Sequence, residues 1–233
     1  MTAQGLDVIP ALQSWPGDGG RYLTLGQVFT SHPVTGDTNC GIYRVQLQGR
    51  HRALLRCHPG SGGAAHLKAW HDRGKAMPVA IALGGPPALI LAAIAPLPEN
   101  VPELMLASLI AGHKLDTCSG PGVHPLIAGA EFALVGHVPP GERRPEGPFG
   151  DHYGYYSLQH DYPVFNVEAL AHRRDAIYPA TVVGKPRQED FFIGDLLQEL
   201  LSPLFPLVMP AVEDLWSYGE TGYHSLGAAV VKQ

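Results

Sequence analysis

Short runs of alternating apolar and polar residues recur along the chain, and this is the pattern of half-buried strands. Turn residues separate the runs; the Pro, Gly and Asp of residues 33–38 lie between the first two. The run at 78–83 (PVAIAL) is apolar throughout, which is typical of a strand buried on both faces. The runs that predict strands are 22–30, 42–48, 53–56, 78–83, 131–137, 164–171, 176–183 and 225–231.

Helical periodicity is less frequent. It predicts helices over 63–73, 88–95, 102–111 and 189–207. The third begins at a proline and stops at Gly112, as helices commonly do. The fourth places Phe192, Leu196, Leu197, Leu200 and Leu201 on one face, and Pro203 and Pro206 limit it. Because the strands follow one another without intervening helices, we predict an α+β fold, a split β-barrel with flanking helices.

Composition narrows the function classes. The 233 residues include 28 Gly and 22 Pro and show no repeat or convincing linker, so we predict a single domain over 1–233. A net charge of −5 disfavours a nucleic-acid partner and a polybasic membrane surface. No apolar run reaches the length of a spanning helix, and the start lacks a signal-peptide pattern. Cys40, Cys57 and Cys118, a sparse and odd set, indicate a reducing, cytoplasmic setting.

The segment 145–156 (PEGPFGDHYGYY) is the densest in chemistry. Glu146 and Asp151 lie five residues apart in a sequence too rich in Gly and Pro for a helix. Two carboxyls close together in a partly dry site repel, so one holds its proton to higher pH and can act as a proton donor. The alternative is a surface loop with solvated acids.

Two further segments carry candidate binding residues. Arg44 lies in an apolar, alternating run five residues after Asn39, and a buried arginine must find a partner, whereas an outward one need not. The glycine-rich segment 57–63 (CHPGSGG) could hold a phosphate on its backbone N–H groups or be an ordinary loop. His58 in it could ligate a metal, cap a helix or be solvated. Structural zinc is disfavoured, since no C-x₂₋₄-C spacing occurs.

Aromatic residues gather after the acidic segment. Their ordinary role is core packing, and the sharper alternative is to line a flat ligand. The residues are Tyr153, Tyr155, Tyr156, Tyr162 and Phe165.

Taken together, these segments resemble the UbiD family of decarboxylases, which use prenylated FMN. The motifs occur in the family's order over nearly the whole chain. They are WPGDGGRYLTLG (15–26), NCGIYR (39–44), PVAIALGGPPALILAAIAPLP (78–98), PPGERRPEGPFGDHYGYY (139–156), YPVFNV (162–167) and HRRDAIY (172–178).

The resemblance implies a flavin-binding split barrel and a non-oxidative, usually reversible decarboxylation of aromatic or α,β-unsaturated carboxylic acids. By position, Arg44, Glu146 and Asp151 match the family's catalytic network. Glu146 would donate the proton to the carbon that loses CO₂, Arg44 would orient it and hold the substrate carboxylate, and Asp151 would tune both. The enzyme would be a carboxy-lyase.

The resemblance also implies a cofactor site. Asn39 and Glu103 match ligands of Mn²⁺ or Mg²⁺, often alongside K⁺, at the cofactor phosphate. Ungapped alignment puts Gly60 where the family has a third ligand, a histidine, and His58 lies two residues upstream. The remaining matches are residues that pack against the flavin, namely Ile42, Tyr43, Ile94, Ala95 and Pro96.

Family members are usually about twice as long, so the chain resembles the flavin-binding domain without the family's N- and C-terminal domains. We therefore expect a homo-oligomer or hetero-oligomer to cover the cofactor, and a flavin prenyltransferase to supply it. Three alternatives stay open: a subunit of a hetero-oligomeric decarboxylase, a flavin-binding protein without decarboxylase activity, and an FMN oxidoreductase. The last is disfavoured by the lack of a dinucleotide fingerprint.

Overall fold

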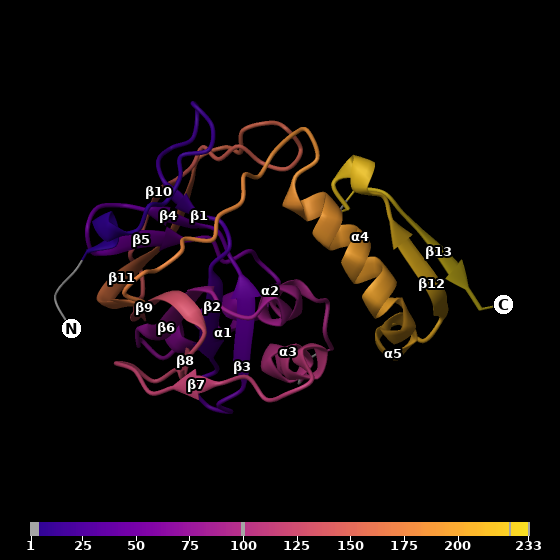
Figure 1. Cartoon of the computed structure of the whole chain (residues 1–233), viewed down its shortest axis with the longest axis horizontal. Coiled ribbons are helices and arrows are strands. Elements are labelled where there is room, and N and C mark those ends of the chain that lie inside the picture. The colour runs from indigo at the N-terminus through magenta and orange to yellow at the C-terminus, as the bar shows by residue number, and fades with distance from the viewer. Residues whose placement is uncertain (1–4, 99–100, 224, 233) are drawn as a thin grey trace.

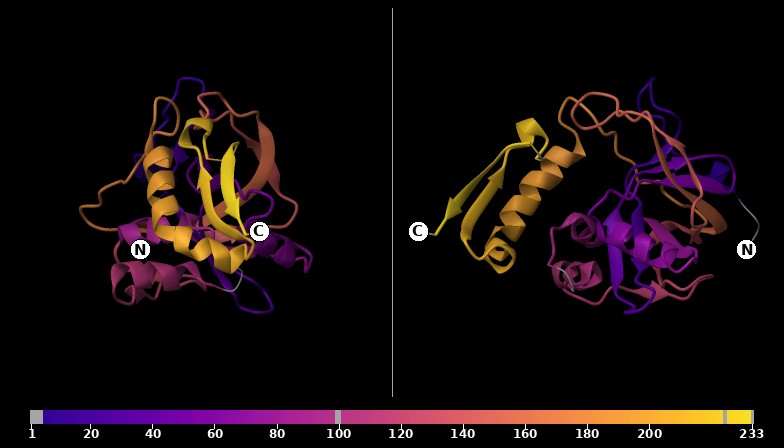
Figure 2. Two further views of the ribbon diagram at one scale, coloured as in Figure 1. Left: turned by 90° about the vertical axis from the view of Figure 1, so that its right-hand side faces the viewer. Right: turned by 180° about the vertical axis from the view of Figure 1, so that it is seen from behind.

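The structure is a computed structural model that describes residues 5–98, 101–223 and 225–232. It has two parts (Figures 1 and 2). The larger part, here called the body, comprises residues 5–187 and contains one curled sheet with helices packed on it. The smaller part, here called the C-terminal unit, comprises residues 188–232 and consists of a long helix beside a hairpin (Figure 1).

The body is built on a nine-stranded antiparallel sheet in the order β1-β4-β5-β11-β9-β6-β2-β3, with β10 paired to β11. In its centre, Ile81 of β6 pairs with Leu134 of β9. The strands are β1 Tyr22–Leu23, β2 Gln27–Ser31, β3 Thr38–Ile42, β4 Val45–Leu47, β5 Arg52–Leu55, β6 Met77–Gly84, β9 Ala130–Val138, β10 Arg143–Glu146 and β11 His160–His172. Two short strands, β7 Thr117–Cys118 and β8 Leu126–Ile127, pair separately.

The chain itself forces this sheet to curl. Strand β3 is at one end of the strand order and β4 is next to the other end, yet only Tyr43 and Arg44 separate them in sequence. The two ends of the sheet must therefore approach each other, which closes a barrel with a split. Tyr43 and Arg44 lie at that split.

Strand β6 shows why the sheet has two apolar faces. Val79, Ile81 and Leu83 point into one buried cluster, and Ala80 and Ala82 point into another. The large side chains fill the inside of the curl, while the alanines leave room for helices to approach the outer face. Two helices cover that face, α2 Pro87–Ile94 and α3 Glu103–Ala111.

Local signals set the helix ends. Helix α1 Gly62–His71 is capped by Ser61, whose Oγ accepts a hydrogen bond from the Ala64 N–H. Helix α3 ends at Gly112, whose φ of 74° is the left-handed conformation that favours glycine.

The α+β split-barrel prediction is confirmed, and so are most elements. Three strand predictions need correction. The 22–30 run breaks into β1 and β2 at the bend around Leu25, and the 42–48 run supplies β4 alone, with Ile42 ending β3. The 176–183 run is extended but forms no strand, because its carbonyl groups accept side-chain hydrogen bonds, from Thr24 and Trp15, in place of a ladder.

The C-terminal unit begins with helix α4 Glu189–Leu201, which is shorter than the predicted 189–207 because Pro203 starts a tighter turn. The hairpin pairs β12 Val212–Ser217 with β13 Gly227–Val231, and every residue of β13 is exposed. Short 3₁₀ and α turns complete the description, at η1 Leu6–Val8, η2 Ser202–Leu204, α5 Phe205–Val208 and η3 Gly219–Thr221.

Among the described residues, one helical stretch, Glu189–Val208, is long and apolar enough by length and composition to cross a membrane, with a mean hydropathy of 1.4. Asp195 and Glu199 interrupt it, so it is not a continuous apolar run. Leu197 and Leu201 of this stretch also line a cleft in the protein. Only 6% of its most apolar window is buried, so most of its apolar side chains are exposed in this chain.

Candidate active site

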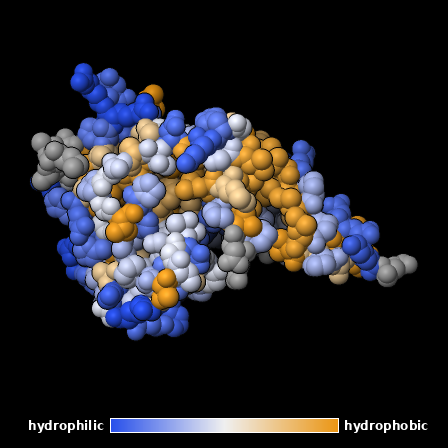
Figure 3. Space-filling model, turned by 90° about the horizontal axis from the view of Figure 1, so that it is seen from below, coloured by the Kyte–Doolittle hydropathy of each residue, from blue (hydrophilic) through white to orange (hydrophobic). Residues whose placement is uncertain are grey.

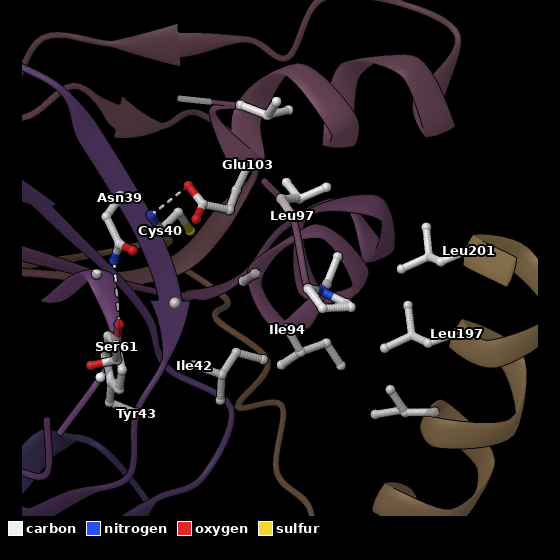
Figure 4. A pocket seen from close by; sticks show the side chains of 18 of the residues that line it. Asn39, Cys40, Ile42, Tyr43, Ser61, Ile94, Leu97, Glu103, Leu197 and Leu201 are labelled. Atoms are coloured by element: carbon white, nitrogen blue, oxygen red, sulfur yellow. Dashed lines mark hydrogen bonds between the residues drawn. The ribbon is translucent and has the colours of Figure 1, made fainter. Parts of the chain in front are cut away.

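A cleft of about 1640 Å³ separates the body from the C-terminal unit. Its body wall comes from β3, the start of α1 and the segment after α2, and its opposite wall comes from α4. Figure 4 shows Leu197 and Leu201 of α4 facing Ile94 and Leu97 across the cleft. Figure 3 shows apolar surface gathered over the region where the two parts meet.

Two oxygen-bearing side chains lie side by side on the body wall, Asn39 from β3 and Glu103 from the first turn of α3. The Cys40 N–H donates a hydrogen bond of 3.0 Å to Glu103 Oε2 (Figure 4). Burial raises the pKa of the Glu103 carboxyl, and that hydrogen bond opposes the shift only in part. A cation at this place would therefore be stabilising.

A glycine pair lets α1 approach these residues. A Cβ on Gly62 would lie 2.1 Å from Asn39 Oδ1, and one on Gly63 would lie 2.9 Å from Tyr43 Oη. Instead, the Gly63 N–H donates to Tyr43 Oη at 3.2 Å, and Asn39 Nδ2 donates to the same oxygen at 3.4 Å. A side chain at either position would have to displace Asn39 or Tyr43, so glycine favours this approach of the helix start to the cleft.

Arg44 and Glu146 form a buried ion pair. Arg44 Nε and Nη2 donate to the two Glu146 oxygens at 2.8 and 2.9 Å, and the Glu146 side chain is fully buried. Such a bidentate pair fixes both side chains in orientation as well as distance. Arg44 also lies 4.5 Å from the centroid of the Phe149 ring, and its Nη2 donates to Ser157 Oγ at 3.2 Å.

Asp151 joins this pair from the following loop. Its Oδ2 lies 3.9 Å from Arg44 Nη1, and its Oδ1 is hydrogen-bonded to His152 Nδ1. Burial opposes the charge on Asp151, but the hydrogen bonds from His152 and the charges of His152 and Arg44 outweigh it and lower the pKa of this carboxyl. The hydrogen bond to Asp151, with the neighbouring acids, raises the pKa of His152 against the effect of its burial.

The N-terminal segment braces the acidic loop. Asp18 Oδ1 accepts from the Gly150 N–H at 2.8 Å, and the Gly19 N–H donates to the Pro148 carbonyl at 2.7 Å. Gln46, two residues beyond Arg44, accepts from the Gly147 N–H at 3.1 Å. The loop that carries both carboxyls is thus fixed from several sides.

The structure brings together most residues predicted for the site. Arg44 lies within ion-pair distance of both Glu146 and Asp151. They do not line the cleft, but their sequence neighbours Tyr43 and His152 do. The predicted flavin-contacting residues that line the cleft are Asn39, Ile42, Tyr43, Ile94, Ala95, Pro96 and Glu103.

His58 is placed elsewhere. It is exposed, its Nδ1 is hydrogen-bonded to the Pro59 carbonyl at 2.8 Å, and it is not among the cleft-lining residues. In the part of the chain that the structure describes, no three His, Cys, Asp or Glu side chains cluster as a metal site. Of the three predicted metal ligands, Asn39 and Glu103 therefore lie on the cleft wall and His58 does not.

Sequence reasoning missed two contributions to the site. His152 directly follows Asp151, so its adjacency was the available signal. Gln46 of β4 lies two residues after Arg44, and the period of two of extended chain places the two side chains on the same side. The α4 wall gave no specific signal, since a buried and a cleft-lining helix face have the same periodicity.

Fold and site together define a class, a split barrel with a buried arginine–carboxylate network beside a large cleft. The family model described as "3-octaprenyl-4-hydroxybenzoate carboxy-lyase Rift-related domain" (UbiD) matches residues 2–186. The chain therefore belongs to the UbiD family.

Individual relatives agree with this assignment. The chain is 55% identical over 236 residues to a protein of Chlamydia pneumoniae that is named as a subunit of 4-hydroxybenzoate decarboxylase, covering 100% of this chain and 40% of that protein. It is 37% identical to an uncharacterized protein of Archaeoglobus fulgidus, covering 100% of this chain and 49% of that protein. The chain thus spans less than half the length of these curated relatives.

Solved structures match over the same extent. The UbiD-class enzyme HmfF from Pelotomaculum thermopropionicum, in complex with FMN, superposes with a TM-score of 0.85 at 26% identity, covering 100% of this chain and 52% of HmfF. The closed form of vanillic acid decarboxylase from Sedimentibacter hydroxybenzoicus gives 0.85 at 27%, covering 92% of this chain and 47% of that enzyme. The body and the C-terminal unit thus share their fold with these enzymes.

Proposed function

We propose that this chain is the flavin-binding, acid-bearing part of a UbiD-type carboxy-lyase, which uses prenylated FMN to decarboxylate or carboxylate an aromatic or α,β-unsaturated acid. The observation that carries the proposal is the bidentate Arg44–Glu146 pair, fully buried at Glu146, with Asp151 against Arg44. A purely structural ion pair does not need a third charged group from a braced loop next to a large cleft. Family membership and the decarboxylase relatives support the same interpretation.

The cleft fits a flavin mononucleotide. Its volume of about 1640 Å³ exceeds what drug-sized ligands occupy. Ile42, Ile94 and Pro96 offer an apolar surface for a planar ring, and the N-terminus of α1 directs the positive end of its helix dipole toward the cleft, which favours an anionic phosphate. The FMN complex of HmfF supports this choice of ligand.

Glu146 and Arg44 would control the proton that replaces the lost CO₂. In the structure both Glu146 oxygens are occupied by Arg44. A substrate carboxylate that reaches Arg44 competes for its guanidinium, and a buried carboxyl that loses its cation takes up a proton. Loss of CO₂ breaks the C–C bond and leaves the electron pair on carbon, to which Glu146 then delivers that proton. The electron sink for this pair is the chemistry that a prenylated flavin supplies when bound.

A divalent cation, Mn²⁺ or Mg²⁺, would be held at the phosphate by Asn39 and Glu103. Magnesium commonly takes one or two carboxylate or amide oxygens from the protein and completes its shell with phosphate and water, so two protein ligands suffice. His58 and a K⁺ ion remain predictions from the resemblance alone.

We also propose that the chain works within an assembly, as a homo-oligomer or beside a different subunit. The exposed residues of β13 and the exposed apolar side chains of α4, including Phe192 and Leu196, offer a surface for a partner. The relative named as a decarboxylase subunit supports the second form. A cytoplasmic location and a flavin prenyltransferase as supplier of the cofactor belong to the same proposal.

The test is CO₂ release by protein co-expressed with a flavin prenyltransferase, over a panel of aromatic and α,β-unsaturated acids. Glu146→Gln removes the proton and little volume, so turnover should fall by about 10²-fold or more while flavin stays bound. Glu142→Gln is the matched control, because Glu142 is paired with Arg144 at the surface, at 3.6 Å. Wild-type turnover in Glu146→Gln would remove Glu146 from the proton path.

The alternatives predict different outcomes. Turnover that appears only after a second polypeptide is added indicates a subunit of a hetero-oligomer. Bound flavin without CO₂ release from any acid, alone or with a partner, indicates a flavin-binding protein and contradicts the proposed function.

A further inference from the structure

His152 lies where the acidic loop meets the C-terminal unit. Of the charged network behind the cleft, Arg44, Glu146 and Asp151 do not line the cleft, whereas His152 does, together with Glu189 and Gly222 of the C-terminal unit. We propose that His152 is a positioning residue that couples the C-terminal unit to Asp151 and so to the buried ion pair. This inference rests on the proposed function.

On the loop side, the Asp151 carboxylate interacts with His152 through one oxygen and with Arg44 through the other. His152 Nδ1 and the His152 backbone N–H both bind Asp151 Oδ1, the latter at 2.7 Å. Asp151 Oδ2 remains directed at Arg44 Nη1, 3.9 Å away. As long as His152 holds one oxygen, Asp151 approaches Arg44 only from the side that Glu146 does not use.

On the other side, the imidazole packs against the C-terminal unit. Gly222 follows η3, and a Cβ on it would lie 2.9 Å from His152 Cδ2 and 3.1 Å from Nε2. Its φ of 71° also favours glycine. The Tyr153 ring lies 4.1 Å from the imidazole between centroids, and Tyr153 Oη is 3.3 Å from Ser225 Oγ. The ring is thus held between the loop and the hairpin.

The carboxylates around the ring favour its protonated form, whereas Arg44 lies on the far side of Asp151, 3.9 Å from its Oδ2. Asp151 lies at Nδ1, and Glu189 and Asp190 at the start of α4 contribute from the C-terminal unit. Tyr153 and Tyr223 are the other titratable groups nearby that the cleft and ring contacts show. Burial opposes the charge but does not cancel it.

The consequence is mechanical. If the C-terminal unit moves away from the body, His152 loses both its packing against Gly222 and the field of two carboxylates. Its hold on Asp151 then weakens, and Asp151 becomes free to compete with Glu146 for the Arg44 guanidinium. The acid geometry is therefore complete only when the C-terminal unit is seated on the loop.

The first arm of the test needs neither cofactor nor substrate. Histidine signals of the full chain are titrated by NMR in wild type, in Asp151→Asn and in the double variant Glu189→Gln with Asp190→Asn. We expect the pKa of His152 to lie above the ordinary 6.5 in wild type and to fall in both variants. Glu168→Gln is the control, since it removes the partner of the surface residue His137 and should leave His152 unchanged.

The second arm measures turnover. His152→Gln should lower kcat about tenfold or more with KM changed less than twofold, and should change the shape of the pH profile above pH 6.5. His152→Asn, which can still place an N–H near Asp151 Oδ1, should recover part of kcat. His137→Gln is the matched control, because His137 forms an exposed pair with Glu168. A structural role alone would scale the profile without changing its shape.

The outcomes separate the two proposals. The coupling is overturned if the pKa of His152 is unchanged by the Glu189 and Asp190 substitutions. It is also overturned if His152→Gln has the same kcat and pH profile as His137→Gln. The expected NMR shifts without turnover by any form, alone or with a partner, overturn the proposed function and support the structural coupling.

Discussion

The body and the C-terminal unit differ in how they bury apolar side chains. The body encloses two clusters of buried residues, one on each face of its sheet. Among the described residues, Leu201 is the one hydrophobic side chain of the C-terminal unit that is buried, while Phe192, Leu196, Leu207 and others are exposed. The body thus carries the folding energy, and the C-terminal unit carries a wall of the site.

This division explains where the chemistry lies. The arginine–carboxylate network is in the body, at the split of the barrel, where two strand ends and a braced loop fix it. The C-terminal unit contributes apolar contacts across the cleft and two acids near His152. The two parts thus meet at His152, the point at which the proposed coupling would transmit the position of the C-terminal unit to the acid network.

The largest contrast should come from one phenylalanine in each part. Phe165 of β11 is fully buried and Phe192 of α4 is 67% exposed. Phe165→Ala should lower the free energy of unfolding by about 3–5 kcal/mol, because it leaves a cavity in the core. Phe192→Ala should change it by less than about 0.5 kcal/mol. Urea unfolding of both variants checks this, and equal losses would show that the C-terminal unit is covered in solution.

A smaller contrast concerns a buried arginine of the body and an exposed arginine at its border with the C-terminal unit. Arg44→Lys keeps the charge but loses the bidentate geometry to buried Glu146, so it should destabilise the fold by about 2 kcal/mol. Arg187→Lys affects an exposed pair with Glu220 at 2.8 Å and should cost less than about 0.5 kcal/mol. Thermal unfolding measures both. Arg44→Lys with wild-type stability would contradict the closed geometry of the pair.

The third contrast compares acids on the two walls of the cleft. Burial raises the pKa of both Glu103 and Glu189, but only Glu103 lies beside Asn39. Asn39→Ala and Glu103→Ala should weaken retention of metal and flavin together by about tenfold or more. Glu189→Ala should retain both within about twofold. Metal analysis and flavin absorbance of the purified variants measure this retention. Unchanged metal and flavin content in Asn39→Ala and Glu103→Ala would rule out the proposed cation site.

The smallest effect is the pH dependence of the Asp151–His152 pair. Because the pKa of His152 is raised, its protonated form stabilises the folded state. This stabilisation is complete below the ordinary pKa of 6.5 and is lost as pH rises through the raised value. Because the pKa of Asp151 is lowered, its ionised form also stabilises the folded state. This stabilisation is present above the ordinary pKa of 3.8 and is lost as pH falls through the lowered value. His152→Gln should therefore cost most, about 1 kcal/mol, between pH 4 and 6.5, and less above it. Urea unfolding at several pH values checks this, and a cost that grows with pH would contradict the assignment.

Elements whose own residues decide their structure were predictable from the sequence. The buried strand β6 and the helices α1 and α3 follow from apolar runs, caps and a terminal glycine. Strand β12 was missed because Glu213 and Asp214 interrupt its apolar pattern. The 176–183 run has strand-like residues, but whether a neighbouring strand is available to pair with it depends on tertiary structure.

Only the site residues that lie in recognisable sequence motifs were predictable. Arg44, Glu146 and Asp151 could be grouped from a resemblance, and the structure brings them into contact. The place of His58 was not predictable, because a loop of glycines leaves its path open until it is folded. The role proposed for His152 depends on a contact with Gly222, 70 residues further on, which no local pattern contains.

The central claim is that the cleft of this chain holds a prenylated flavin. Native mass spectrometry of the chain co-expressed with a flavin prenyltransferase, together with its absorption spectrum, tests it most directly. The account predicts one prenylated FMN per chain, in a dimer or larger assembly formed with itself or with a partner. A folded chain that carries no flavin, either alone or in every assembly it forms, would contradict it.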